Sequence, residues 1–161
     1  MKIPSEINLT LTLYMYFQKG IKVKICSSFL HSGKWNGFGG KVEANESILQ
    51  GAIREVKEEC GVDIKQENIV KLGLIDFEFE NDPIHLEGHI FEALNYSGEI
   101  IESEEMKPKW FEIKDLPYDK MWQADKFWHP YFFQRQKFQS YFLYDKHNKI
   151  IMHDLKTVES L

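Results

Sequence analysis

Three glutamates gather at the end of one predicted helix, and this feature constrains the fold of the chain most strongly. Residues 35–62 (WNGFGGKVEANESILQGAIREVKEECGV) begin with a glycine-rich loop and continue into a helix predicted over residues 45–60. Asn45 is the predicted N-cap, and Gly61 fits the position that ends a helix. The apolar residues at helical spacing are Leu49, Ala52, Ile53, Val56 and Cys60. They share one face, which we expect to pack in the core.

The acidic side of this helix carries Glu55, Glu58 and Glu59 at positions i, i+3 and i+4. That spacing places three like charges side by side, an arrangement that a bound cation stabilises. Oxygen ligands favour Mg²⁺, Mn²⁺ or Ca²⁺ over zinc, and Mg²⁺ is commonly shared with substrate phosphates. Arg54, four residues before Glu58, is placed to hold one of the carboxylates. The set therefore indicates a metal–phosphate site, with a solvated acidic helix face as the alternative.

Composition limits the class of protein. With 161 residues, 43% hydrophobic and 14% aromatic, we expect a single domain over residues 1–161 with a sizeable core. The net charge of −5, without a basic run, argues against a nucleic-acid polymer as partner. No apolar stretch is long enough to cross a membrane, and the N-terminal MKIPSEINLT lacks a signal-peptide core. Cys26 and Cys60 form no disulfide framework, so we expect a cytoplasmic protein, and we expect it to be a monomer.

The remaining pattern predicts many strands and one further helix. Strands are predicted over residues 8–17, 21–26, 39–43, 68–80, 84–94, 110–113, 138–145 and 149–155. The clearest alternation is LIDFEFE at 74–80, where Ile75, Phe77 and Phe79 share one face. Residues 95–107 are predicted to be an acidic loop, and residues 130–137 a short helix. The fold class is therefore α+β.

The spacing of residues around this helix resembles a known family. Gly40, Glu46 and the run REVKEECGV at 54–62 match the signature of the Nudix hydrolases. The resemblance implies an α/β/α sandwich around a mixed β-sheet, and Mg²⁺- or Mn²⁺-dependent hydrolysis of a nucleoside diphosphate linked to another group. It further implies that Glu55, Glu58, Glu59 and the Gly40 carbonyl are metal ligands. With Arg54, these glutamates form the predicted catalytic set.

A narrower resemblance covers most of the chain. WNGFGGKVE at 35–43, FEF at 77–79, EEMKPKWF at 104–111, MW with Asp125, and KFQSYF at 137–142 resemble the oxidised purine nucleoside triphosphatases. These 8-oxo-dGTP diphosphatases release the nucleoside monophosphate and pyrophosphate, which sanitises the nucleotide pool and prevents mutation. Glu105 resembles a further metal-associated carboxylate of that family. The resemblance implies that the base-binding residues are Asn36, Phe77, Phe79, Trp122 and Asp125.

The chemistry of these residue types suits a purine pocket. Asn36 offers both a donor and an acceptor, and Asp125 can accept two N–H groups of a guanine-like edge. Stacking on Trp122 contributes about 1–3 kcal/mol in single-base examples. The alternative is structural: Asn36 only turns the loop, while Phe77 and the other aromatic residues only fill the core.

Ala124 is a departure from the family pattern, which has two adjacent acids where this chain has Ala124 and Asp125. One ionised carboxylate suits a guanine-type edge, so we hypothesise that 8-oxoguanine nucleotides are preferred and oxidised adenines are handled poorly. The base that activates the attacking water is open between Glu59 and Glu105. Two rival functions also stay open. One is a Nudix enzyme for an ordinary dNTP, a methylated purine nucleotide or a dinucleotide, and the other is a nucleotide-binding module without hydrolysis.

Overall fold

A computed structural model of the chain describes residues 8–20, 22–28, 33–104 and 106–161. The strands are β1 (Asn8–Lys19), β2 (Lys22–Ser28), β3 (Trp35–Asn36), β4 (Phe38–Lys41), β5 (Ile69–Phe79), β6 (Ile84–Ala93), β7 (Met106–Glu112), β8 (Phe138–Tyr144) and β9 (Ile150–Thr157). The helices are α1 (Ile48–Cys60) and α2 (Asp125–Phe133), with 3-10 turns at Gln66–Asn68, Ile113–Asp115 and Tyr118–Lys120.

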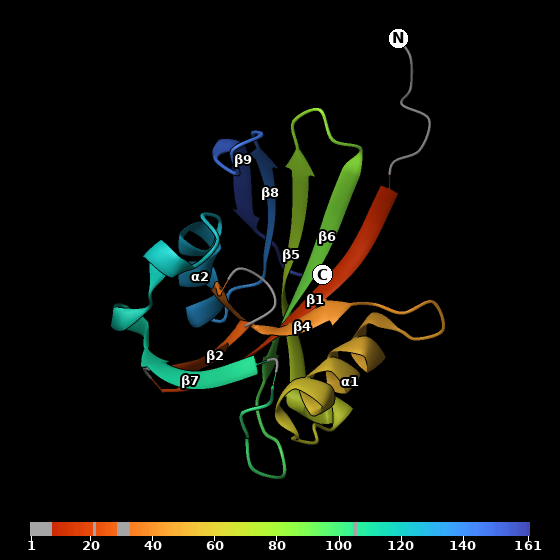
Figure 1. Ribbon diagram of the computed structural model, residues 1–161, viewed down its shortest axis with the longest axis vertical. Helices are drawn as coiled ribbons and strands as arrows, with labels where there is room; N and C mark the ends of the chain where they lie inside the picture. The colour runs from red at the N-terminus through yellow and green to blue at the C-terminus, as the bar shows by residue number, and fades with distance from the viewer. Residues whose placement is uncertain (1–7, 21, 29–32, 105) are drawn as a thin grey trace.

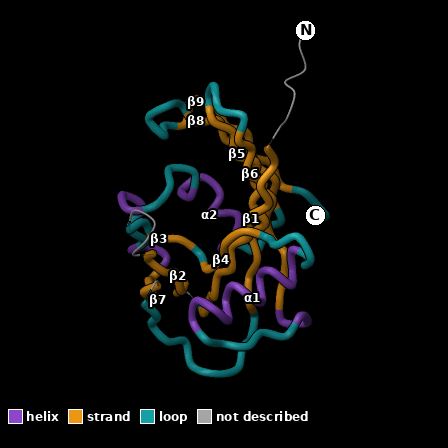
Figure 2. The backbone as a smooth tube through the Cα atoms, turned by 45° about the vertical axis from the view of Figure 1, so that its right-hand side comes forward, coloured by secondary structure: helices purple, strands orange, loops and turns teal. Residues whose placement is uncertain are grey.

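All of these strands belong to one mixed sheet, which is long and strongly twisted in Figures 1 and 2. Its main order is β3-β2-β1-β6-β5-β8-β9, while β4 pairs with β1 and β7 pairs with β2. The pairs β1–β6 and β5–β8 are parallel, and the others are antiparallel. This mixed sheet with two helices confirms the predicted α+β fold class.

The two helices pack on opposite faces of the sheet. Tyr16 and Phe17 are neighbours on β1, so their side chains point to opposite faces. Tyr16 packs in a cluster with Trp128 of α2, and Phe17 in a second cluster with Val56 of α1. In Figure 1, α1 lies beside β4, whereas α2 lies near β8 and well apart from α1. The face covered by α2 therefore belongs to one core and the face covered by α1 to another.

Helix α1 begins later than the sequence pattern predicts. The predicted N-cap at Asn45 is wrong, because Ser47 caps the helix. The Ser47 hydroxyl accepts the Gln50 N–H over 3.1 Å, and the Gln50 side chain accepts the Ser47 N–H over 2.8 Å. This reciprocal pair satisfies two backbone donors, which a cap at Asn45 does not do. The predicted end is confirmed, since Gly61 adopts a left-handed φ of 81°.

Helix α2 begins five residues before the predicted range, at Asp125 instead of 130. Pro130 lies inside the helix, and Trp128 is 2% exposed, since its ring belongs to the core. Burial of these aromatic side chains outweighs the local cost of the proline. Strand β7 also begins earlier than predicted, because Met106 already pairs with Ser28 of β2. None of the helices in the described residues combines the length and the apolar character needed to cross a membrane.

Candidate active site

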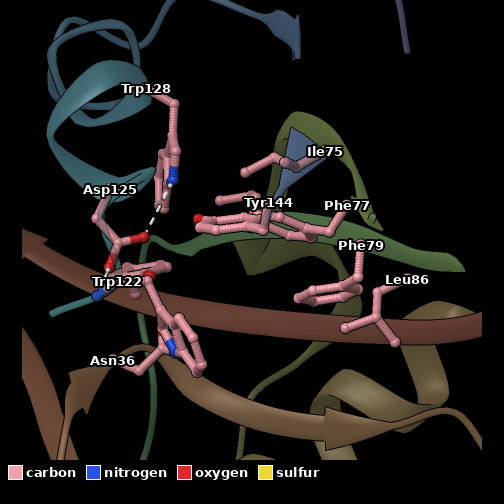
Figure 3. A pocket seen from close by; sticks show the side chains of 11 residues that line it. Asn36, Ile75, Phe77, Phe79, Leu86, Trp122, Asp125, Trp128 and Tyr144 are labelled. Carbon is pink, nitrogen blue, oxygen red and sulfur yellow. Dashed lines mark hydrogen bonds between the residues drawn. The ribbon is translucent and has the colours of Figure 1, made fainter. Parts of the chain in front are cut away.

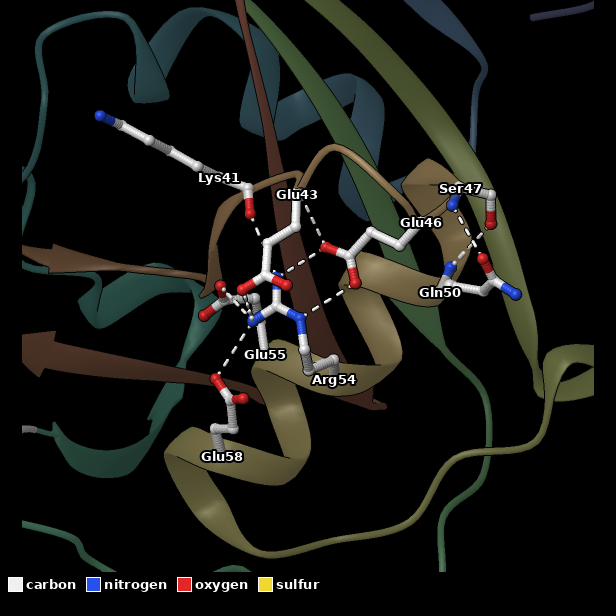
Figure 4. A network of polar contacts seen from close by, with 8 residues as sticks. All are labelled: Lys41, Glu43, Glu46, Ser47, Gln50, Arg54, Glu55 and Glu58. Carbon is white, nitrogen blue, oxygen red and sulfur yellow. Dashed lines mark hydrogen bonds and ion pairs between the residues drawn. The ribbon is translucent and has the colours of Figure 1, made fainter.

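Arg54 lies at the centre of the carboxylate cluster on α1 (Figure 4). Its Nε and Nη2 atoms donate to both carboxylate oxygens of Glu46, over 3.0 and 2.7 Å. Its Nη1 atom donates to Glu55 over 2.9 Å and to Glu58 over 3.1 Å. A further bond from Nη2 reaches the Lys41 carbonyl over 3.2 Å. These are five hydrogen bonds, and a guanidinium has five N–H groups, so every donor of Arg54 is used within the protein.

The bidentate pair with Glu46 is the anchor of this cluster. Hydrogen bonding from Arg54 lowers the pKa of Glu46 to about 2, and the same bond raises the pKa of Arg54. Both groups therefore stay charged at neutral pH. Glu46 precedes the helix, whereas Glu55 and Glu58 lie within it, so the guanidinium connects the loop to the helical carboxylates.

Strand β4 lies directly against two of the three glutamates. A Cβ atom added at Gly40 would lie 2.7 Å from Oε1 of Glu55, so only glycine leaves the space that this carboxylate fills. One helical turn further, Oε2 of Glu59 accepts the Gly39 N–H over 3.0 Å. The glycine pair in the sequence therefore allows a close approach of strand backbone and helix carboxylates.

Glu58, the remaining glutamate, is more open to solvent than Glu55. The side chain of Glu58 is 60% exposed and that of Glu55 is 17% exposed. In the described ranges, no three His, Cys, Asp or Glu side chains converge into a compact metal-binding group. Glu55 and Glu58 turn toward Arg54, whereas Glu59 turns toward Gly39. The three carboxylates therefore do not meet at one point. Glu105 lies outside the described residues.

These groups fit a hard divalent cation in their chemistry. Glu55, Glu58, Glu59 and the Gly40 carbonyl are all oxygen donors, which Mg²⁺ and Mn²⁺ prefer. The side chain that Gly40 lacks leaves its backbone open beside the Glu55 carboxylate. Strand β4 and helix α1 therefore bring at least two of the predicted donors, Gly40 and Glu55, to one place.

A pocket opens on the opposite face of the sheet, between the strands and α2 (Figure 3). Its volume, counted together with the open space at its mouth, is about 570 Å³. The lining residues are Tyr16, Asn36, Ile75, Phe77, Phe79, Leu86, Ile90, Trp122, Asp125, Trp128 and Tyr144. All five residues predicted to bind the base are among them, although they come from three separate parts of the chain.

Asn36 presents one defined side of its amide to the pocket. Its Oδ1 atom accepts the Tyr16 hydroxyl over 3.0 Å and the Gly37 N–H over 2.8 Å. Two donors at one atom identify it as the oxygen, so the other atom is the NH₂ group. Within the described part of the chain, Nδ2 has no hydrogen-bond partner. The pocket therefore carries a hydrogen-bond donor at Asn36 that none of the described residues uses.

Asp125 is the acid of the pocket, and it is 4% exposed at the first residue of α2. Its oxygens accept Nε1–H of Trp128 and the backbone N–H of Trp122, each over 3.2 Å. Burial raises the pKa of Asp125 to about 7, although these two hydrogen bonds and Lys34 lower it. The carboxyl group is thus poised between its two protonation states near neutral pH.

Aromatic rings form the remaining walls. Phe77 and Phe79 point into the pocket from β5, and Trp122 is 38% exposed near its mouth. Lys34 Nζ lies 5.2 Å from the Trp122 ring centroid, a cation–π contact. Both Phe77 and Phe79 also pack against core residues, so each of them lines the pocket and belongs to the edge of the core.

Six of the residues that line the pocket were not predicted. For some of them the sequence pattern indicates a position on the same face as the predicted residues. Ile75 continues the alternation of Phe77 and Phe79, which places it on the same face. Tyr144 occupies one of the alternating buried positions of β8. Trp128 was not predicted because the helix was predicted to begin only at residue 130, two residues after it. The others are Tyr16, Leu86 and Ile90, whose strands pass beneath the pocket and carry no local signal of a site.

The pocket and the carboxylates are joined by a short stretch of chain. Asn36 lines the pocket, and Gly40, four residues later, lies against Glu55. At roughly 3.3 Å per residue the two Cα atoms are at most about 13 Å apart. A molecule with an aromatic ring at one end and phosphates at the other therefore has one part of the site for each end.

Comparison with known proteins agrees with this arrangement. Residues 20–136 match the NUDIX domain. A Danio rerio protein named oxidized purine nucleoside triphosphate hydrolase is 41% identical over 152 residues, which cover 94% of this chain and 96% of that protein. The Mus musculus protein of the same name is 40% identical, covering 80% and 81%. The crystal structure of the mutator MutT protein from Bacillus halodurans superposes with a TM-score of 0.78 at 25% identity, covering 91% of this chain and 97% of that one.

The chain therefore belongs to the Nudix family. Nudix hydrolases act on small-molecule nucleotides and generally use divalent metal ions such as Mg²⁺.

Proposed function

We propose that this protein hydrolyses oxidised purine nucleoside triphosphates of the 8-oxo-dGTP type, releasing the nucleoside monophosphate and pyrophosphate. The observation that carries the proposal is that Asn36, Trp122 and Asp125 line one pocket, while Gly40, four residues after Asn36, lies against Glu55 of α1. The names of the Danio rerio and Mus musculus relatives support the same substrate class. In the cell, such a reaction removes damaged precursors from the nucleotide pool and prevents mutation.

The base is held by complementary polar groups and by stacking. Asn36 Nδ2 supplies a donor for a purine carbonyl, and the carboxylate form of Asp125, one of the two forms that it takes near neutral pH, accepts N–H groups of a guanine-type edge. Phe77, Phe79 and Trp122 contact the flat faces of the base. Each polar group is fixed by its neighbours before the ligand arrives, which lowers the entropic cost of binding.

Mg²⁺ is the proposed cofactor, with Mn²⁺ as a substitute. Glu55, Glu58, Glu59 and the Gly40 carbonyl would hold the ion, and Glu105 is proposed as a further carboxylate beside it. A bound divalent cation supplies neutralisation of phosphate charge and lowers the pKa of a water molecule.

Hydrolysis requires a base and correctly placed carboxylates. Water attacks phosphorus, the bond between the α- and β-phosphates breaks, pyrophosphate leaves, and the proton of the water passes to a carboxylate. Glu59, oriented by the Gly39 N–H, and Glu105 are the candidate bases. Arg54 has no donor left for the substrate, so we assign it a positioning role for Glu55 and Glu58.

The single acid in the pocket sets the proposed preference among oxidised purines. Ala124 is fully buried beside Asp125 and offers no second carboxyl group to share a proton. We therefore propose poor hydrolysis of oxidised adenine nucleotides. Comparable kcat/KM values for 2-oxo-dATP and 8-oxo-dGTP would rule this preference out.

The proposal is tested against its rivals with a substrate panel in Mg²⁺. The panel contains 8-oxo-dGTP, the ordinary dNTPs, a methylated purine triphosphate and a dinucleotide, with pyrophosphate or monophosphate release as the readout. Preference for another member identifies a different Nudix activity. Tight nucleotide binding with no product release identifies a binding module instead.

The cellular setting forms part of the proposal. Cys26 and Cys60 are both buried free thiols, which suits a reducing compartment such as the cytoplasm. We propose a monomer with a single domain that acts there on nucleotides alone. Light scattering coupled to size-exclusion chromatography tests the monomeric state, and cell fractionation tests the location.

A further inference from the structure

Tyr144, the last residue of β8, carries a polar group that the proposed function does not use. Its side chain is 2% exposed and lines the pocket. It lies on the buried face of β8 together with Phe142, whereas Tyr141 points to the other face. A hydroxyl group in an aromatic wall is chemically different from the phenylalanines around it.

The Tyr144 ring is held in place by stacking. Its centroid lies 5.7 Å from that of Phe79 at an interplanar angle of 22°, and 6.3 Å from that of Phe77 at 35°. Parallel pairing of β5 and β8 brings Phe79 and Tyr144 into register. Figure 3 shows the hydroxyl at the end of the ring that points toward Asp125 and Trp128. The oxygen therefore has a fixed position beside the acid of the pocket.

This buried hydroxyl has no hydrogen-bond partner among the described residues. Burial raises the pKa of Tyr144, and the nearby Ala124 backbone opposes this shift without reaching hydrogen-bond geometry. The hydroxyl therefore keeps its proton at neutral pH. Both oxygens of Asp125 already accept hydrogen bonds, from Trp122 and Trp128. A buried polar group without a partner is costly, so an unused donor that faces a pocket points to a ligand atom.

We propose that Tyr144 is a specificity-determining residue whose hydroxyl donates a hydrogen bond to the exocyclic oxygen of a 6-oxopurine. The inference rests on the proposed function, because it takes the base edge to lie against Asp125. A guanine-type edge presents N2–H and N1–H donors followed by the O6 acceptor. When a carboxylate accepts the N–H groups, the O6 atom needs a donor beside that carboxylate, and Tyr144 is placed there. A 6-aminopurine has an NH₂ group in place of O6 and no N1–H.

The test compares Tyr144→Phe with Tyr141→Phe. Both variants remove one hydroxyl from the same strand, but the Tyr141 hydroxyl donates to Glu78 on the face away from the pocket, over 3.0 Å. The dissociation constants of 8-oxo-dGMP and 8-oxo-dAMP are measured by calorimetry without metal, so the readout does not depend on turnover. Thermal unfolding of each variant is recorded, and Tyr144→Phe is expected to be at least as stable as the wild type.

For Tyr144→Phe we expect 8-oxo-dGMP to bind about 3- to 10-fold more weakly, as for one lost neutral hydrogen bond. Binding of 8-oxo-dAMP should change less than about 2-fold in this variant, and Tyr141→Phe should leave both constants unchanged. If wild type and Tyr144→Phe bind 8-oxo-dGMP equally, or if both ligands weaken alike, the Tyr144 assignment is wrong while the proposed function stands. If the wild type does not bind 8-oxo-dGMP, the proposed function is overturned, and this assignment with it.

Discussion

The Tyr16 hydroxyl donates to Oδ1 of Asn36 over 3.0 Å and so fixes which side of the amide faces the pocket. The two residues lie on β1 and β3, strands that are both neighbours of β2 in the sheet. With the Gly37 N–H as the second donor to Oδ1, the amide cannot flip without losing two hydrogen bonds. The Asn36 NH₂ group is thus a preset donor rather than an adaptable one.

Removing this support should weaken substrate binding more than it slows hydrolysis. In Tyr16→Phe the Gly37 N–H still holds Oδ1, so we expect a loss of about 1 kcal/mol in the free energy of unfolding. KM for the preferred nucleotide should rise by about 3- to 10-fold with little change in kcat, because a ground-state contact is loosened. Steady-state kinetics and urea unfolding check both values. A fall in kcat at unchanged KM would contradict this role for Tyr16.

Gly40→Ala should separate activity from stability. The added Cβ would lie 2.7 Å from Oε1 of Glu55, at the flexible end of that side chain. The carboxylate can move away at a cost of less than about 1 kcal/mol in stability, whereas misplacing a catalytic group by about 1 Å can cost roughly 100-fold in rate. We expect kcat to fall by that order while the unfolding midpoint stays close to the wild type. Unchanged kcat would show that the position of Glu55 is unimportant.

Glu58→Gln tests the metal assignment, with Glu43→Gln as a matched control. Both glutamates are exposed, at 60% and 69% of the side chain, and both lie within 4 Å of Arg54. Exposed ion pairs contribute about 0–1 kcal/mol, so neither variant should lose much stability. Only Glu58→Gln should lose most of the activity and weaken Mg²⁺ binding measured by calorimetry. Near-normal turnover of Glu58→Gln at saturating Mg²⁺ would remove Glu58 from the metal site.

Asp125 should make the stability of the protein depend on pH. Because burial raises its pKa from 3.8 to about 7, the protonated form is favoured in the folded state. Its stabilising contribution is full below about pH 4 and is lost as the pH rises through about 7, a change of roughly 4 kcal/mol for three pKa units.

Comparison with Asp125→Asn isolates this contribution. His129, whose pKa burial lowers to about 3, opposes the trend at low pH but does so in both proteins. The wild-type free energy of unfolding minus that of the variant should therefore decrease from pH 4 to pH 8. Denaturant unfolding at several pH values gives this difference. A difference that is independent of pH would show that Asp125 has an ordinary pKa in the folded protein.

Local patterns were sufficient to predict much of this fold. Alternation in β5 placed Ile75, Phe77 and Phe79 on one face, and Gly61 marked the end of α1. The starts of both helices were predicted wrongly for two different reasons. Ser47 prevailed over Asn45 through a reciprocal cap with Gln50, and α2 was extended by the burial of its aromatic residues. Burial of that kind depends on tertiary contacts, which a single sequence does not show.

The candidate site, like the fold, could be predicted only in part from the sequence. The glutamates were predicted from their helical spacing and the base-pocket residues from the family resemblance, and the pocket residues lie together in the structure. Other features depend on which strands and helices lie side by side. They are the Tyr16–Asn36 hydrogen bond, the Tyr144 hydroxyl, which has no partner among the described residues, and the use of all five Arg54 donors. Those neighbours are set by long-range pairing such as β1 with β6 and β5 with β8. No local pattern encodes such pairings.

The most direct test of the proposed function is the ratio of kcat/KM for 8-oxo-dGTP to that for dGTP, with pyrophosphate release in Mg²⁺ as the readout. A pocket whose polar groups read the oxidised base should favour 8-oxo-dGTP by at least about tenfold. Equal or faster hydrolysis of dGTP, or no pyrophosphate from 8-oxo-dGTP, would contradict the proposed function.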